Sequence, residues 1–85
     1  MGLDGVELIM ALEERFDLIV SDTDAATMLT VGAMDDYTIA VLRKRGHVDE
    51  EEVKRQIRKL ICSQLCVKES QLKPETRFIQ DLGVG

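Results

Sequence analysis

Aromatic residues are almost absent from this chain, and it has no long apolar run. Its 85 residues include no tryptophan, one tyrosine and two phenylalanines, while hydrophobic residues make up 45%. A core must therefore be built from Leu, Ile, Val, Ala and Met side chains. No apolar stretch approaches the length of a membrane span, and we expect neither a membrane segment nor a signal peptide. The length predicts one small domain of modest stability.

The chain also lacks a cysteine framework and a recognisable metal-binding pattern. Cys62 and Cys66 lie four residues apart in one predicted helix, a spacing that does not build a disulfide scaffold. We therefore expect a reduced, cytoplasmic protein. His47 is the only histidine, and the acidic stretch at Asp22 and Asp24 lacks the glycine and glutamate of a calcium-binding loop. No metal site is expected.

The exposure of Cys62 is predicted by its angle on that helix. At 100° per residue it lies far from the apolar positions Val53 and Ile57 and beside Arg58 and Lys59. This placement predicts a partly exposed thiol. The sharper alternative is a reactive thiol whose pKa is lowered by its surroundings.

The net charge of −5 comes from the first half of the chain. Residues 1–46 hold nine acids against four bases, whereas residues 47–85 hold seven of each. An acidic surface repels phosphate backbones, so we expect no nucleic-acid partner. The same surface favours basic protein partners.

Apolar periodicity and capping residues predict an all-α fold with three longer helices and one short one, followed by a long loop. The expected helices cover residues 3–16, 22–29, 30–45 and 49–65. Thr30 and Asp49 are predicted N-caps, and Gly46 follows the basic end of the third helix as its stop signal. In the final loop, Phe78 and Ile79 are the expected anchors in the core.

The first predicted helix carries Glu7, Glu13 and Glu14 with Met10 among them. Charged positions of this kind usually form a solvated face. A methionine among carboxylates is also typical of an adaptable docking surface. From the residues alone, the two interpretations stay open.

Particular segments of the chain resemble one protein family. Residues 3–17, Leu-Asp-Gly-Val-Glu-Leu-Ile-Met-Ala-Leu-Glu-Glu-Arg-Phe-Asp, closely resemble the second helix of acyl carrier proteins. Residues 21–25, Ser-Asp-Thr-Asp-Ala, and residues 30–33, Thr-Val-Gly-Ala, resemble that family's third helix and the start of its fourth. Tyr37 matches the tyrosine of the family's fourth helix.

The remaining segments resemble the part of the family that precedes those helices. Residues 52–67 are similar to the family's first helix, and residues 78–83, Phe-Ile-Gln-Asp-Leu-Gly, to the loop that leads into its second. Joining Gly85 to Met1 would restore the family order.

The resemblance therefore implies one acyl-carrier-like four-helix domain over residues 1–85, in circularly permuted order. Residues 1–46 match the family's second to fourth helices, and residues 49–85 match its first helix and the following loop. The competing explanation is a window cut out of register from tandem carrier domains. If the connection between the two segments is too short to join them within one bundle, they could pair between chains as a swapped dimer.

The family's Asp-Ser-Leu motif falls at the join and is incomplete here. In that motif the serine carries 4′-phosphopantetheine. In this chain Gly85 falls at the Asp, Gly2 at the Ser, and Leu3 matches the Leu. A glycine has no hydroxyl, so the resemblance implies that the chain as written carries no cofactor although its family does.

The resemblance implies a non-enzymatic domain of the kind that shuttles acyl chains in fatty acid or polyketide biosynthesis. Expected partners are basic surfaces on acyl-chain-processing enzymes, not nucleic acid or membranes, and the expected state is a monomer. The implied recognition positions are Leu3, Glu7, Met10, Glu13 and Glu14. The positions implied to line an acyl pocket are Leu12, Phe16, Val20, Met28, Leu60, Phe78 and Ile79. The alternative function is an inert structural or protein-interaction module.

Overall fold

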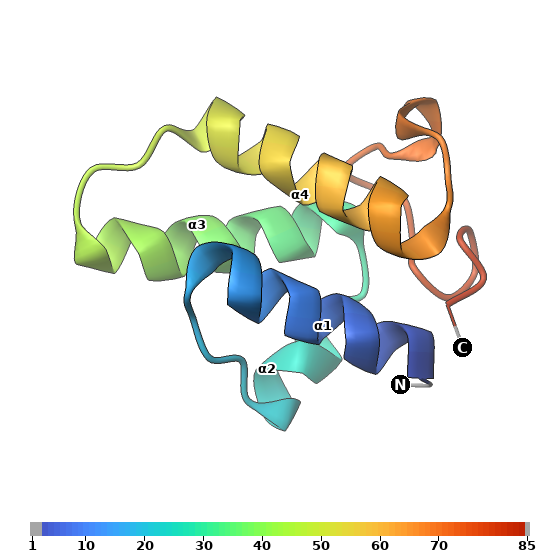
Figure 1. Ribbon diagram of the computed structural model, residues 1–85, viewed down its shortest axis with the longest axis horizontal. Coiled ribbons are helices and arrows are strands. Elements are labelled where there is room, and N and C mark those ends of the chain that lie inside the picture. Colours follow the sequence, from blue (N-terminus) through green and yellow to red (C-terminus); the bar gives the residue numbers. More distant parts are fainter. Residues whose placement is uncertain (1–2, 85) are drawn as a thin grey trace.

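The computed structural model describes residues 3–84, with the backbone alone for Leu3. Figure 1 shows its four α-helices and one short 3-10 helix: α1 Leu3–Phe16, α2 Asp22–Thr27, α3 Val31–Arg45, α4 Glu50–Leu65 and η1 Glu69–Gln71. Within the described residues, the strand-like pairing is limited to an isolated bridge between Thr30 and Arg77. The prediction of an all-α fold is confirmed.

The helix boundaries follow the predicted caps closely. Thr30 and Asp49 precede α3 and α4, and their side chains accept hydrogen bonds from backbone N–H groups three residues later. The expected helix 22–29 ends earlier, at Thr27, because the backbone of Met28 leaves the helical region with ψ of 69°. The final loop is also more regular than expected, since its first part forms η1.

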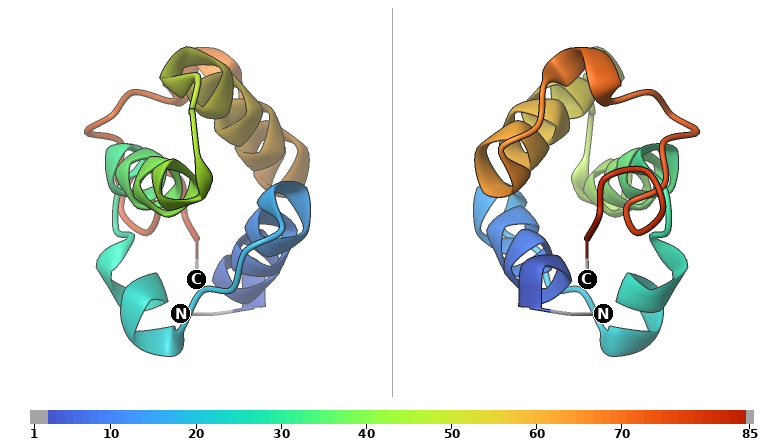
Figure 2. Two further views of the ribbon diagram at one scale, coloured as in Figure 1. Left: turned by 90° about the vertical axis from the view of Figure 1, so that its left-hand side faces the viewer. Right: turned by 90° about the vertical axis from the view of Figure 1, so that its right-hand side faces the viewer.

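One aliphatic core holds the three longer helices together. α4 packs against both α1 and α3, and the end-on views show the helices arranged around this core (Figure 2). The fully buried apolar side chains come from these helices, from the residue after α2 and from the final loop: Leu8, Leu12, Met28, Val31, Met34, Ile57, Ile61 and Phe78. α2 contributes no buried residue. It lies at the periphery, where the Tyr37 hydroxyl donates a hydrogen bond to Asp24 Oδ2 at 3.1 Å.

Ile79 does not anchor the final loop in the core, so that part of the prediction is wrong. Its side chain is 54% exposed, whereas Phe78 is buried. The loop turns sharply here, with the N–H of Asp81 donating to the carbonyl of Arg77 at 2.9 Å. This turn directs Phe78 inward and leaves Ile79 at the surface. Ile19, in the connector between α1 and α2, is 89% exposed.

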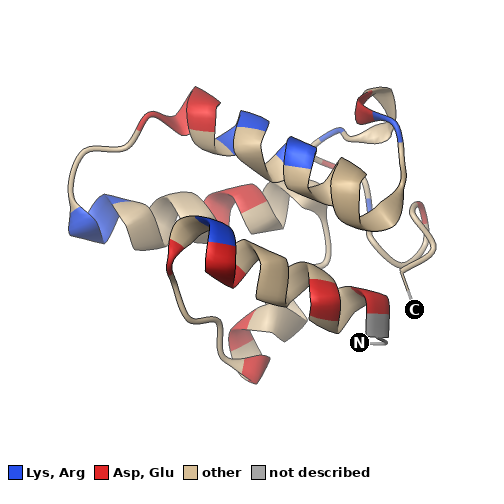
Figure 3. Ribbon diagram, in the orientation of Figure 1, with Lys and Arg blue, Asp and Glu red and all other residues tan. Residues whose placement is uncertain are grey.

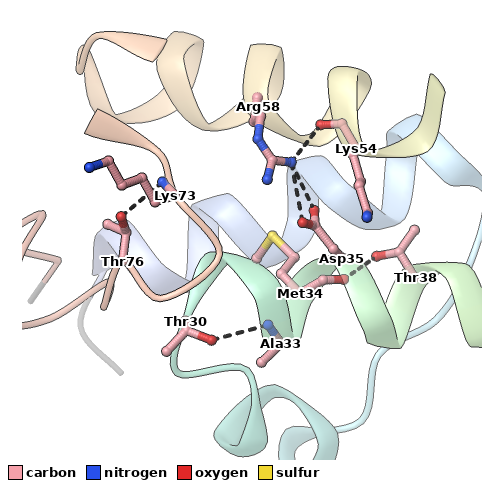
Figure 4. Close-up of polar contacts among 9 residues, drawn as sticks. All are labelled: Thr30, Ala33, Met34, Asp35, Thr38, Lys54, Arg58, Lys73 and Thr76. Carbon is pink, nitrogen blue, oxygen red and sulfur yellow. Dashed lines mark hydrogen bonds and ion pairs between the residues drawn. The ribbon is translucent and has the colours of Figure 1, made fainter. Parts of the chain in front are cut away.

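The first turn of α3 is capped by the final loop. A helix begins with backbone N–H groups that have no acceptor within the helix. Here the N–H of Val31 donates to the carbonyl of Thr76 at 3.0 Å, and the N–H of Gly32 donates to the carbonyl of Pro74 at 2.9 Å. The next N–H group is bound by the hydroxyl of the N-cap residue (Figure 4). The loop backbone therefore completes the hydrogen bonding of the helix.

Further hydrogen bonds hold the loop on both sides of its contact with α3. The N–H of Phe78 donates to the carbonyl of Leu29 at 3.1 Å. The buried Thr76 hydroxyl accepts from the N–H of Lys73 at 2.9 Å (Figure 4) and donates to the carbonyl of Gln71, also at 2.9 Å. An irregular segment with so many satisfied backbone groups holds a defined conformation.

A buried ion pair joins α3 to α4. Asp35 is only 2% exposed, and both of its carboxylate oxygens contact Arg58 Nη1, at 3.3 and 3.2 Å (Figure 4). Arg58 Nη1 also donates to the carbonyl of Lys54 at 3.1 Å. Burial raises the pKa of the Asp35 carboxyl, and the Arg58 guanidinium opposes that shift without cancelling it. Burying both charges costs desolvation free energy that offsets much of their attraction, so the pair links α3 to α4 without adding much net stability.

The far end of α1 is held by α3. The Arg45 guanidinium donates to the backbone carbonyls of Phe16 and Asp17, the latter a residue in the left-handed region with φ of 52°. A cation at this position satisfies the last carbonyls of α1 and complements the helix dipole. α4 ends in a similar conformation, because its C-cap Cys66 has φ of 55°.

The close contact between α3 and the loop predicts the effect of Gly32→Ala. Alanine in a helix usually stabilises by about 1 kcal/mol relative to glycine. At this position, however, an added Cβ lies 2.8 Å from the carbonyl oxygen of Pro74. We expect the substitution to lower the free energy of unfolding by about 1–3 kcal/mol, measured by urea denaturation. Ala40→Gly, at an exposed site of α3, is the control for helix propensity alone. A gain in stability for Gly32→Ala would mean that the loop at Pro74 moves to accommodate the added Cβ.

Candidate functional site

The exposed side of α1 presents two carboxylates and a thioether. Glu7, Met10 and Glu14 are exposed, and their spacing of three and four residues places them on one side of the helix. Met10 is 54% exposed. Among the residues that the structure describes, neither glutamate forms an ion pair. These three residues are called the α1 face below.

Glu13 lies in a different environment from the α1 face. Its side chain is half-buried, and Oε2 accepts a hydrogen bond from the N–H of Val20 at 2.9 Å. This bond ties α1 to the connector that leads to α2. Glu13, implied as a recognition residue, thus also fixes local structure. The side chain of Leu3, the remaining member of that set, lies outside the described residues.

Charge is unevenly distributed over the molecule. Figure 3 shows acidic residues along α1 and α2, in the first half of α3 and in the first turn of α4, and basic residues at the end of α3 and further along α4. At the end of α3, Arg43 pairs with Glu50, and Arg45 binds the carbonyls that end α1. Two of the three basic residues at this end of α3 thus have partners within the molecule. Six of the nine acidic residues in the first half of the sequence lie in α1 and α2.

A cavity of about 380 Å³ lies between α1 and α2 and is called the α1–α2 cavity here. Its lining is Val6, Ile9, Met10, Glu13, Val20, Asp22, Ala25 and Ala26. Met10 is shared with the α1 face, so an occupant of the cavity would sit next to that face. Two of the lining residues, Glu13 and Asp22, are acidic.

A second cavity, of about 400 Å³, lies between α2 and the final loop and is called the α2–loop cavity. Its apolar lining is Ala25, Ala26, Met28, Leu29, Phe78, Ile79 and Val84, with Thr30, Arg77 and Gln80 as the polar members. Ala25 and Ala26 line both cavities, so α2 forms the wall between them.

The seven residues implied to line an acyl pocket do not share one cavity. Val20 lines the α1–α2 cavity, whereas Met28, Phe78 and Ile79 line the α2–loop cavity. Leu12 and Leu60 are buried among the helices, and Phe16 packs half-buried against the same core. The implied pocket is therefore divided by α2 and by the packed core.

Sequence reasoning missed the cavity-lining residues that no periodicity marks. Val6 and Asp22 line the first cavity, and Arg77 and Val84 line the second. Val6 is an exposed residue of α1, Asp22 is the first residue of α2, and Arg77 and Val84 lie in the final loop. A helix of six residues and an irregular loop carry no usable hydrophobic period, so only the folded arrangement identifies these residues.

The residues that match the incomplete attachment motif, Gly2 and Gly85, lie outside the described residues. The chain's three serines are placed elsewhere. Ser21 is the N-cap of α2, where its Oγ accepts from the N–H of Asp24, and Ser63 and Ser70 are exposed in α4 and η1. None of these three hydroxyls stands at the start of α1.

The two cysteines differ in exposure. Cys66 is exposed, while Cys62 is partly buried and packs against the core. Burial raises the pKa of the Cys62 thiol, and the nearby Glu69 carboxylate raises it further. The alternative of a lowered pKa is therefore wrong, because desolvation and an acidic neighbour act on this thiol.

Two further searches concern metals and membranes. Within residues 3–84, no group of three or more His, Cys, Asp and Glu side chains is arranged to hold a metal ion. No helix in the same range is both long enough and apolar enough to cross a membrane.

Comparison with known proteins gives matches to curated relatives. The chain is 57% identical over 36 residues to one of them, an acyl carrier protein of Buchnera aphidicola subsp. Schizaphis graminum (strain Sg). The match supports a relationship to the acyl carrier protein family. It covers 42% of this chain and 46% of that relative, so the chain spans about half the length of the curated relative it matches. No family model matches the chain, and no solved structure matches it.

The different environments of the cysteines predict their order of reaction. In the folded protein, N-ethylmaleimide should modify Cys66 first and Cys62 several times more slowly, because a raised pKa leaves less thiolate. Raising the pH should accelerate Cys62, since its thiolate fraction then grows. Peptide mass spectrometry gives the order, and the Cys62→Ser and Cys66→Ser variants assign each rate. Faster reaction at Cys62 would mean that the end of α4 opens in solution.

Proposed function

We propose that this protein is a non-enzymatic docking domain of the acyl-carrier type, whose α1 face binds basic surfaces of enzymes that process acyl chains. The observation that carries the proposal is the α1 face itself: Glu7, Met10 and Glu14 are exposed together, and the two carboxylates form no ion pair within the described residues. The relationship to an acyl carrier protein supports the same partner class.

The chemistry of the α1 face suits a transient, electrostatic partner. Carboxylates that form no ion pair within the described residues attract a basic patch during approach and set its orientation. Met10 adds a flexible apolar contact at the centre of the face, of the kind that adapts to different partner surfaces. Glu13 takes no direct part in this proposal, because its carboxylate already binds the connector.

We further propose that the chain is a circular permutant of the family's order. Three observations support this proposal. The start of α1 and the end of the described chain lie at the same end of the bundle in all views (Figures 1 and 2). Only residues 46–49 separate α3 from α4. The match to the relative covers 36 residues, no more than either proposed segment contains.

The same proposal explains why the chain would not carry 4′-phosphopantetheine. The transferase reaction needs a serine hydroxyl at the start of α1, where the helix N-terminus favours an incoming phosphate. Gly2 falls at that position in the sequence, and the three serines lie elsewhere. Docking to enzymes and carrying the cofactor are thus separable properties, and we propose only docking for this chain.

Charge reversal on the α1 face tests docking. The double variant Glu7→Lys and Glu14→Lys should weaken binding to an enzyme that acts on acyl carrier proteins, such as a phosphopantetheinyl transferase, by about tenfold at low salt. The difference should shrink as salt is raised, because screening already weakens the attraction for the parent chain. Titration calorimetry or surface plasmon resonance at two salt concentrations measures both effects.

The double variant Glu51→Lys and Glu75→Lys is the matched control for that experiment, since both residues are exposed and lie outside α1. It changes net charge by the same amount per substitution and should have a much smaller effect. Equal losses for both variants would assign the effect to overall charge. Unchanged affinity of the double variant at low salt would leave an inert module as the better description.

Attachment of 4′-phosphopantetheine tests the proposed permutation. Incubated with coenzyme A and a permissive transferase, the chain as written should show no mass gain. A chain reopened between residues 46 and 49, with Asp-Ser joining Val84 to Leu3, should gain one phosphopantetheine, and its serine-to-alanine variant should not. Intact-mass spectrometry distinguishes the three proteins. Loading of the unaltered chain, or none in the folded reopened chain, would contradict the proposal.

A further inference from the structure

A further cavity, of about 280 Å³, lies between α4 and η1 and is called the α4–η1 cavity. Its lining consists only of charged residues: Glu51, Lys54, Arg55, Arg58 and Glu69. The first four share one side of α4, because they recur at a spacing of three or four residues, and Glu69 begins η1. The volume lies just below the range of about 300–1,000 Å³ that is typical of sites for drug-sized ligands. The cavity therefore suits a small charged ligand.

Arg58 is held in one orientation at this cavity. Its Nη1 atom contacts both carboxylate oxygens of Asp35 and donates to the carbonyl of Lys54 (Figure 4), and only 16% of the side chain is exposed. Within residues 3–84, Nε and Nη2 of Arg58 have no hydrogen-bond partner, and no buried side-chain nitrogen is left without one. Nε and Nη2 therefore reach solvent. They form the edge of the guanidinium that can bind an oxyanion with two parallel hydrogen bonds.

Lys54 supplies a second cation, one helical turn before Arg58. It forms no ion pair within the described part of the chain, whereas Arg55 pairs with Glu52. Burial raises the pKa of the Asp35 carboxyl, and the Arg58 guanidinium and the Lys54 ammonium both oppose that shift. Both cations therefore lie near the same buried carboxylate, and Lys54 remains available to an anion.

The ion pair between Asp35 and Arg58 adds little net stability, as its desolvation shows. Apolar side chains of similar volume at both positions would hold α3 and α4 together at least as well. A charged pair kept inside a small bundle without a gain in stability is typical of a functional position. The consequence of this pair is that one edge of Arg58 is fixed at the α4–η1 cavity.

From these observations we propose that the α4–η1 cavity binds a small free oxyanion, with inorganic phosphate as the simplest case, between the Nε–Nη2 edge of Arg58 and the ammonium of Lys54. Asp35 is the positioning residue, since it acts on the anion only through Arg58. The carboxylates of Glu51 and Glu69 oppose the anion. Both are exposed, so solvent and salt screen their repulsion.

The proposed site is independent of the docking function. It lies on α4 and η1 and uses neither Glu7 nor Glu14 of the α1 face. Phosphate binding and docking to a basic partner can therefore succeed or fail separately, and each has its own measurement.

Titration with sodium phosphate at constant ionic strength tests the proposal. Backbone amide NMR shifts should saturate and concentrate at residues 54–58 and at Glu69, whereas sodium chloride should give no saturable shift. Lys54→Gln should weaken phosphate binding about tenfold, because it removes a charge-assisted hydrogen bond. The matched control is Lys44→Gln, which removes the same charge from an exposed position of α3 outside the cavity and should leave the affinity unchanged.

The carboxylates of the lining give a test of the opposite sign. Glu69→Gln should tighten phosphate binding about threefold, because it removes an exposed like charge from the cavity. Glu75→Gln is its control, since Glu75 is exposed in the final loop and does not line the cavity. It should change the affinity much less.

The role of Arg58 is tested with a variant that keeps the fold. Arg58→Gln alone would leave Asp35 buried without its ion-pair partner and is expected to destabilise the chain. The double variant Asp35→Val and Arg58→Met removes both charges and keeps apolar contact between α3 and α4. Its urea midpoint should equal or exceed that of the parent, while phosphate binding falls at least about tenfold. Circular dichroism establishes that each variant is folded.

Three results would overturn the proposal. The first is a set of shifts in the parent chain that grow linearly with phosphate and do not saturate. The second is parent-like phosphate affinity in the folded double variant, which would make Arg58 a structural residue only. The third is an equal loss of binding in Lys54→Gln and Lys44→Gln, which would assign the effect to overall charge.

Discussion

The N–H groups at the start of α3 require acceptors, and the final loop supplies them through the carbonyls of Thr76 and Pro74. This requirement fixes more than one helix end. It brings Phe78 into the core, places the turn after it beside α2, and directs the end of the described chain toward α1. The second cavity exists because the loop is held at this distance from α2. A single set of backbone hydrogen bonds thus determines both the completion of the core and the shape of the α2–loop cavity.

The sequence was sufficient to predict the longer helices because their determinants are local. Thr30 and Asp49 act as N-caps, and the apolar positions of α1, α3 and α4 recur at helical spacing. The path of the final loop was not predictable, since its partners are backbone groups far away in the chain. The same limit explains Ile79, whose neighbour Phe78 is buried while it is not. Both residues are large and apolar, and only the turn that contains them, closed by the N–H of Asp81 and the carbonyl of Arg77, directs one inward and the other outward.

The candidate site, like the fold, was only partly predictable from the sequence. Exposure of Glu7, Met10 and Glu14 follows from the helical period, which places them opposite Leu8 and Leu12. The hydrogen bond from Val20 to Glu13 could not be foreseen, because it depends on how the connector folds back. The division of the apolar residues between two cavities depends on the position of α2, a helix with no buried residue of its own. Surface chemistry was thus accessible from sequence, while the enclosed spaces required the packed structure.

The direct connection between α3 and α4 has a consequence for how the molecule reaches its fold. Asp35 and Arg58 are only 23 residues apart, and Arg43 meets Glu50 across seven residues. In a chain reopened at residues 46–49, these helices would stand at opposite ends, and their contacts would be among the most distant in sequence. Low contact order favours early formation, because little chain entropy is lost in closing a short loop. The present order therefore makes the α3–α4 hairpin the natural nucleus, with α1 and the final loop joining later. Two chains with the same native contacts would then fold by different routes.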